Sequence, residues 1–295
     1  MSRFLEDFSA LIRAQGWNVY RVTEIVGENA PETVTISPCN ACQNSYSVAK
    51  AFVVTAIGFL WDEGKLKLDE RVPEVLGALC PTAMEPRWQN VTVDMVMRHF
   101  CGLPQNFLDI DATDPRAFGT DYLGYTLREP MLRDPQVAAV YTDAAYYLLS
   151  RIVEVRAGEA LDNFLWKRLF APLGFREVAW SRCPQGHPMG ATGLYVYTED
   201  MAKLGVLYRD GGIWQGQRLL SEAFVKAVLS APYELKPIAD GIAFGKGGMH
   251  GQMLMVVPEQ GRVVAWHGFV RGGVKEAVQW VAAYRDWFDI FFTNP

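Results

Sequence analysis

The sequence predicts an α+β protein: an antiparallel β-sheet flanked by N- and C-terminal helices and interrupted by an inserted all-α domain. Short β-branched stretches lie toward the two ends, helical patterns fill the middle, and no repeat or flexible linker divides the chain. With 295 residues, half of them apolar, the chain can bury two lobes. We expect residues 1–60 and 175–295 to form the sheet domain and residues 61–174 the helical insert, with any active site in the cleft between them.

The elements are predicted in order along the chain. Phe4, Phe8, Leu11 and Ile12 have the spacing of one helix face. Residues 19–26 and 33–36 are typical of two strands of a hairpin, and residues 47–174 are mainly helical, punctuated by Pro and Gly. Further strands are expected at residues 193–197, 251–258 and 262–268, before an amphipathic helix at residues 274–292.

Composition and charge exclude several classes of protein. The 28 Lys and Arg against 33 Asp and Glu give a net charge of −5, which repels phosphate backbones, so no nucleic-acid partner is expected. Glu6, Asp7 and Arg13 interrupt the stretch where a signal peptide would be apolar, and the apolar run at residues 51–61 is too short to span a bilayer. We therefore expect a cytoplasmic protein without a membrane partner, and the sequence leaves its oligomeric state open.

The cysteines are odd in number and scattered, which predicts reduced thiols and no disulfide framework. They are Cys39, Cys42, Cys80, Cys101 and Cys183. A zinc site starting from Cys39 and Cys42, completed by Cys101, His99 or Cys183, is the alternative. Because no second C-x-x-C and no H-x-x-x-H follows, we expect no metal.

The sharpest chemical signal is Ser47 three residues before Lys50, at the start of the apolar helix. This spacing puts both side chains on one helix face, near free N–H groups that can stabilise an anion. Burial should lower the pKa of Lys50 and make it a plausible proton acceptor for Ser47. The structural alternative is that Ser47 caps the helix and Lys50 reaches out to water.

Several segments in the same order resemble one family. Y-S-V-A-K at residues 46–50, followed by D-E-G-K-L-K-L-D at residues 62–69, resembles the serine β-lactamase and penicillin-recognising hydrolases, in their class C-like branch. Residues 91–104, 190–205 and 210–216 are similar to further segments of that family, and the resemblance extends over about residues 38–268. It implies a β-lactamase/transpeptidase-like fold and a serine hydrolase that needs no cofactor. In this alignment His99 has a structural role.

Tyr141-Thr142-Asp143 is similar to the family's Y-[ST]-[ND] element, which makes Tyr141 the expected partner of Lys50. A phenol beside a cation ionises more easily, and the phenolate can take the proton of Ser47 and later return it to a leaving group. Asp143 stands where Asn is usual. Its charge is expected either to orient Lys50 through a salt bridge or to alter what the site binds.

The third catalytic element has two candidates. Lys246-Gly247-Gly248 precedes a G-Q hairpin as the family's [KH]-[TS]-G strand does, so the resemblance pairs the N–H groups of Met249 and Ser47 as the oxyanion hole. Trp266-His267-Gly268 competes as a W-x-G element, but follows the hairpin. His250 is expected to line the pocket mouth or to lie in a solvent-facing loop.

Together these residues predict a hydrolase that forms an acyl-enzyme with a small ester or amide. Gly247 lacks the hydroxyl that many β-lactamases place in the middle of the triplet, which weakens the case for carboxylate-bearing β-lactams. The alternative function is a catalytically inactive module with the same fold that binds a ligand or senses cell-wall fragments.

Overall fold

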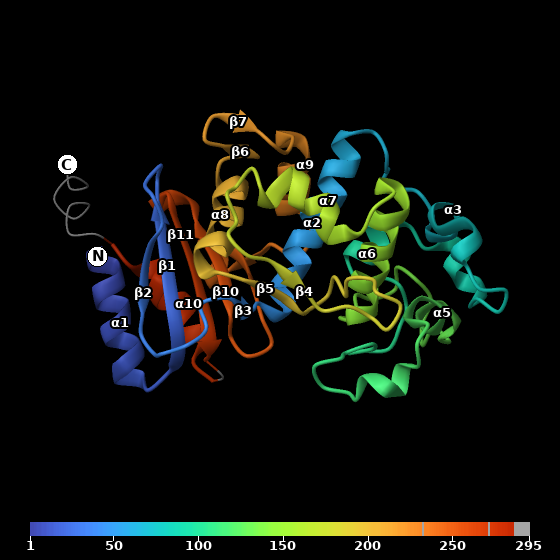
Figure 1. Ribbon diagram of the computed structural model, residues 1–295, viewed down its shortest axis with the longest axis horizontal. Coiled ribbons are helices and arrows are strands. Elements are labelled where there is room, and N and C mark those ends of the chain that lie inside the picture. Colours follow the sequence, from blue (N-terminus) through green and yellow to red (C-terminus); the bar gives the residue numbers. More distant parts are fainter. Residues whose placement is uncertain (232, 271, 286–295) are drawn as a thin grey trace.

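The computed structural model describes residues 1–231, 233–270 and 272–285. Figure 1 shows the main sheet toward one end of the molecule and many of the helices toward the other, with α2 (Ala49–Asp62) between them. Helices α1 (Arg3–Gln15) and α10 (Val274–Ala283) cover one face of the sheet, and α8 (Thr198–Arg209) packs on the other. The predicted antiparallel sheet flanked by N- and C-terminal helices is confirmed, with both of these helices on one face.

Among the described residues, the main sheet has the strand order β2-β1-β11-β10-β9-β8. Its strands are β1 (Asn18–Val26), β2 (Glu32–Thr35), β8 (Lys236–Ile238), β9 (Ala243–Gly247), β10 (Met253–Val257) and β11 (Arg262–Phe269). The predicted hairpin is β1 with β2, and the strands predicted at residues 251–258 and 262–268 are β10 and β11. Along β10, Met253 and Met255 face α1 and α10 whereas Leu254 and Val256 face α8, as the period of two in a strand requires.

Shorter strands lie outside the main sheet. The strand predicted at residues 193–197 is β5 (Leu194–Val196), which pairs with β3 (Gln43–Asn44) and β4 (Ala179–Trp180) in a separate sheet. Strands β6 (Ile213–Trp214) and β7 (Gln217–Arg218) form a small hairpin. Since β3 directly precedes the turn that contains Ser47, this small sheet holds the N-terminal side of that turn in place.

The central helix α2 is buried from Ala49 to Leu60 and packs against α6, α7 and α9. The remaining helices are α3 (Val72–Leu76), α4 (Val93–Met97), α5 (Tyr122–Arg128), α6 (Asp143–Ala157), α7 (Leu161–Leu165) and α9 (Glu222–Ser230). Residues 61–174 thus contain α3 to α7. Because one hydrophobic cluster runs from these helices through α2 to a face of the sheet, the division at residues 60 and 174 stays a prediction.

The C-terminal helix is shorter than predicted. Helix α10 ends at Ala283, where Tyr284 turns to an extended backbone with φ −61° and ψ 137°. The predicted continuation over residues 286–292 lies outside the described residues. None of the helices in the described ranges combines the length and apolar character needed to cross a membrane.

Candidate active site

Ser47 lies in a tight turn that leads into α2. A 3₁₀ turn, η1 (Tyr46–Val48), precedes the first residue of the helix, and Tyr46 has a left-handed backbone with φ 49°, which is unusual for a bulky residue. The Tyr46 N–H donates to Asn44 Oδ1 at 2.8 Å. Val48 takes the N-cap position of α2, so the alternative in which Ser47 caps this helix is wrong.

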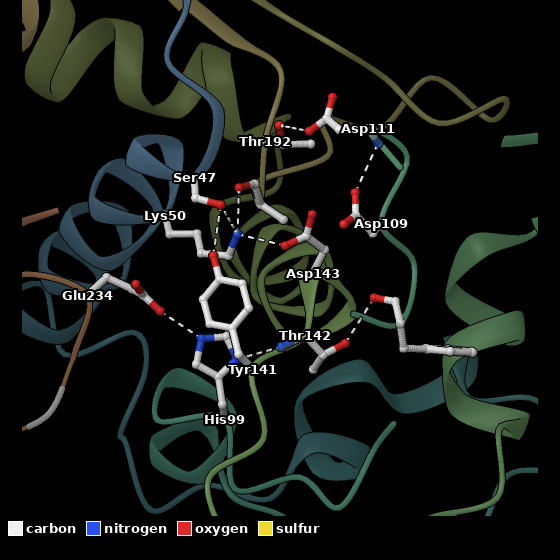
Figure 2. Close-up of polar contacts among 12 residues, drawn as sticks. Ser47, Lys50, His99, Asp109, Asp111, Tyr141, Thr142, Asp143, Thr192 and Glu234 are labelled. Atoms are coloured by element: carbon white, nitrogen blue, oxygen red, sulfur yellow. Dashed lines mark hydrogen bonds and ion pairs between the residues drawn. The ribbon is translucent and has the colours of Figure 1, made fainter. Parts of the chain in front are cut away.

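Lys50 is completely buried beneath Ser47 (Figure 2). Its ammonium group donates to Ser47 Oγ at 3.0 Å, to Asp143 Oδ1 at 2.7 Å and to the carbonyl of Ala191 at 2.8 Å. These three contacts use all the donors that an ammonium group has. The alternative in which Lys50 extends to water is therefore also wrong.

The predicted downward shift of the Lys50 pKa is wrong. Burial alone would lower the pKa of Lys50, but the negative charge of Asp143, 2.7 Å away, outweighs it and holds this pKa above its ordinary value. The apolar surroundings of Lys50 on α2 alone favour a lower pKa, but Asp143 belongs to another helix, α6, and contacts Lys50 across the site. The salt bridge with Asp143 thus favours the charged form of Lys50.

Tyr141 is the other functional side chain that contacts Ser47. Its hydroxyl lies 2.8 Å from Ser47 Oγ, and Lys50 Nζ lies 4.8 Å from the centre of its ring. The tyrosine precedes α6, whose first residue is Asp143, so one short segment brings both side chains to Lys50. Of the two expectations for Asp143, the structure shows the salt bridge that orients Lys50. The catalytic roles of these residues stay predictions.

The strand β9 and the residue that follows it bring Lys246 and Gly248 to the same site. Lys246 Nζ lies 5.0 Å from the centre of the Tyr141 ring. A Cβ atom on Gly248 would come within 2.8 Å of the Ser45 carbonyl, so only glycine permits this approach to the Ser47 turn. Met249, which follows, is 39% exposed. This placement favours the N–H groups of Ser47 and Met249 as the oxyanion hole, which stays a prediction.

The competing triplet Trp266-His267-Gly268 lies on β11, which β10 separates from β9. Trp266 is buried and its indole N–H donates to the Gly251 carbonyl at 2.7 Å. The geometry therefore favours Lys246-Gly247-Gly248 as the third element. His250 packs its ring against Tyr46, 4.7 Å between centroids, and Phe269, 4.4 Å, so it supports the loop beside Met249.

His267 should make the protein sensitive to acid. Burial lowers its pKa from about 6.5 to about 4, so the unfolded chain takes up this proton at a higher pH than the folded chain. Neutral His267 therefore contributes about 3 kcal/mol to the free energy of unfolding above about pH 6.5, and this contribution is lost as the pH falls toward 4. Urea unfolding from pH 7 to 4 should show a smaller loss for His267→Gln than for the wild type. Equal losses would contradict this assignment.

Glu234 is a site residue that sequence reasoning missed. It is fully buried just before β8, its Oε1 lies 2.7 Å from His99 Nε2, and its carboxylate forms an ion pair with Lys246. Burial alone would raise the pKa of Glu234, but the charge of Lys246 and the hydrogen bond from His99 hold it below its ordinary value. In the sequence, Glu234 is a single carboxylate between Tyr233 and Leu235, and this pattern is too common to predict a functional site.

Carboxylates also gather beside Lys50, as Figure 2 shows. Ligand oxygens of Asp109, Asp111 and Asp143 lie within 4.8 Å of one another, the donor type that hard cations prefer. Asp143 already pairs with Lys50, and Asp111 hydrogen-bonds to Thr192. Burial, followed by the charge of Asp143, raises the pKa of Asp109. Across the described ranges this is the one such cluster, so Cys39 and Cys42 gain no third ligand for the zinc alternative.

Comparisons with known proteins agree with this architecture. A 6-aminohexanoate-dimer hydrolase of Paenarthrobacter ureafaciens is 24% identical over 276 residues, which cover 77% of this chain and 69% of that protein. Penicillin-binding protein 4 of Amycolatopsis lactamdurans is 33% identical over 137 residues, 45% of this chain and 34% of that protein.

Solved structures show the same fold. A penicillin-binding protein from Bacillus halodurans superposes with a TM-score of 0.74 at 19% identity, covering 96% of this chain and 99% of that one. A D-stereospecific amidohydrolase from Streptomyces gives 0.70 at 17% identity, covering 94% and 97%. The family model described as Beta-lactamase matches residues 40–273. Because that match includes the Ser47 turn, α6 and β9, the chain belongs to the β-lactamase family, as the ordered sequence segments predict.

Proposed function

We propose that this protein is a serine hydrolase that cleaves a small ester or amide through an acyl-enzyme on Ser47. One observation carries the proposal: Ser47 Oγ lies 2.8 Å from the Tyr141 hydroxyl and 3.0 Å from Lys50 Nζ. A nucleophile within hydrogen-bonding distance of a base is the arrangement that covalent catalysis requires. Membership of a family with hydrolase relatives supports the same reaction class.

In the proposed reaction, Tyr141 acts as a phenolate beside the ammonium group of Lys50 and removes the Ser47 proton as Oγ attacks the carbonyl carbon. The N–H groups of Ser47 and Met249 would hold the resulting oxyanion. As the bond to the leaving group breaks, Tyr141 returns the proton to that group. Water then attacks the acyl-enzyme and gives a proton to Tyr141, which passes it to Ser47 as the acid leaves. Lys50 stays protonated throughout.

An inactive ligand-binding module is not favoured. If the activity had been lost, nothing would maintain the hydrogen bonds of Ser47. Lys50 Nζ and the Tyr141 hydroxyl nevertheless lie 3.0 and 2.8 Å from Ser47 Oγ. Burying Lys50 completely is also costly for stability, since a buried ion pair seldom stabilises a fold more than apolar packing does. A reactive site is a better reason to keep this ion pair than the fold alone.

The charges around the site favour substrates without a carboxylate near the reacting bond. The positive charge of Lys246, whose side chain is 11% exposed, is balanced by buried Glu234. Asp109 lies with Asp111 beside Lys50 and would repel an anionic acyl group. Penicillins and cephalosporins carry such a carboxylate, so we propose neutral esters or amides as the better substrates.

Substitution of Gly247 tests this preference. A Cβ atom there would lie 3.4 Å from Met253 Cε and 3.7 Å from the Gln252 carbonyl, so a side chain fits without a clash. Gly247→Thr supplies the missing hydroxyl and should raise kcat/KM for a penicillin about tenfold relative to that for a neutral ester. Gly247→Val has the same shape without the hydroxyl and is the control. Equal gains for Val and Thr, or efficient cephalosporin hydrolysis by the wild type, would contradict the argument.

The proposed function as a whole is tested with four substrate classes: p-nitrophenyl esters, linear amides, D-amino-acid peptides and β-lactams. Turnover of an ester or amide, with fluorophosphonate labelling of Ser47 found by peptide mass, is the expected result. Absence of both would contradict the proposal. We also propose a cytoplasmic location, which is supported by five free cysteines.

A further inference from the structure

Glu234 connects two parts of the site that are far apart in the chain. Its carboxylate accepts a hydrogen bond from His99 Nε2 at 2.7 Å and forms an ion pair with Lys246 on β9. The side chains of Glu234, His99 and Lys246 are 0%, 3% and 11% exposed, so water screens these contacts little. The sheet is therefore linked to the segment after α4 through one buried carboxylate.

His99 extends this link to the segment that carries the proposed base. Its Nδ1 accepts the N–H of Thr142 at 3.3 Å, so the ring proton lies on Nε2 and points to Glu234 (Figure 2). The His99 ring also packs on the Tyr141 ring, 4.7 Å between centroids. Burial lowers the pKa of His99, which keeps the ring neutral at pH 7 although Glu234 is adjacent.

Three charged or titratable side chains pack against the Tyr141 ring, and two carboxylates pair with these neighbours. They are Lys50 of α2, Asp143 of α6, Lys246 of β9, and His99 and Glu234 behind the ring. The two ammonium groups lie 4.8 and 5.0 Å from the ring centre, and each has a carboxylate partner. Asp143 balances Lys50, and Glu234 balances Lys246.

We propose that Glu234 is a positioning residue, which holds Lys246 and His99 around Tyr141 and so sets the place of the proposed base and the charges that surround it. This inference rests on the proposed function. Glu234 reaches Tyr141 only through these two neighbours and contacts no reacting atom. Its removal should therefore change the rate and the pH dependence of acylation, with little effect on the binding of a small neutral substrate.

The test is a charge cycle in the whole protein, with p-nitrophenyl acetate as the probe. Glu234→Gln leaves Lys246 unbalanced, so the midpoint of the rising limb of the kcat/KM profile should move down by about one pH unit. Lys246→Met leaves the charge of Glu234 unbalanced and should move this midpoint to a higher pH. The double variant has no unbalanced charge, so its midpoint should return to the wild-type value. In each variant kcat should fall about 10- to 100-fold and KM change less than threefold.

A merely structural role cannot produce opposite shifts that cancel. If both single variants keep the wild-type midpoint, or shift it in the same direction, the inference is wrong. If Glu234→Gln fails to fold, the double variant replaces it in the test, because that variant leaves no buried charge without a partner. A wild-type kcat in the double variant would also overturn the inference. A wild-type protein that neither turns over ester nor labels at Ser47 would instead contradict the proposed function.

Discussion

Replacing Ser47 with alanine is expected to abolish ester and amide hydrolysis, with a loss of roughly 10⁴-fold or more in kcat, because no acyl bond can form. The fold should remain. Lys50 loses one acceptor but keeps Asp143 and the Ala191 carbonyl, and Ser47 does not cap α2. The free energy of unfolding should therefore change by no more than about 1–2 kcal/mol. Turnover, fluorophosphonate labelling and a urea unfolding curve measure these three expectations.

Ser45→Ala is the matched control for this experiment. Ser45 is buried two residues before Ser47, and its hydroxyl has no hydrogen-bond partner in the part of the chain that the structure describes. Loss of that hydroxyl should leave both hydrolysis and labelling close to wild type. If Ser47→Ala still hydrolysed ester or were still labelled, another residue would be the nucleophile and the proposed mechanism would be wrong.

Local patterns made the core of the site predictable from sequence. Ser47 and Lys50 are three residues apart across the 3₁₀ turn that leads into α2, so their contact follows from local helical geometry. Tyr141 could be added because its segment resembles a family element with a known place beside Lys50. The sheet was predictable for a similar reason, since β1 is rich in β-branched residues, β10 is apolar throughout and β11 is mostly apolar.

Properties that depend on long-range contacts could not be predicted in the same way. The charge of Lys50 depends on Asp143 and on the carbonyl of Ala191, which lie 93 and 141 residues away in sequence. Glu234 meets His99 across 135 residues and has no motif around it. A pKa responds to the whole surroundings of a group, so the apolar pattern of α2 gave the wrong direction for Lys50.

The second large effect is expected for Tyr141→Phe, which should lower kcat/KM for a neutral ester by about 10²–10⁴-fold. The change removes one oxygen, 2.8 Å from Ser47 Oγ, and keeps the ring that packs on His99 and lies beside Lys50. Ser47 then has no neighbouring phenolate to take its proton. Single-turnover kinetics should place the loss in the acylation step, with the unfolding free energy nearly unchanged.

Tyr146→Phe is the matched control, because Tyr146 is also near Lys50, at 5.8 Å from ring centre to Nζ, but its hydroxyl donates to the Met97 carbonyl. That variant should lose about 1 kcal/mol of stability and keep its activity. If Tyr141→Phe stayed within about twofold of the wild-type rate, Tyr141 would not be the base. Lys50 would then have to accept the proton, which its charge and its three occupied donors argue against. The rate of this one variant thus decides whether the buried lysine acts as a base or as a fixed positive charge.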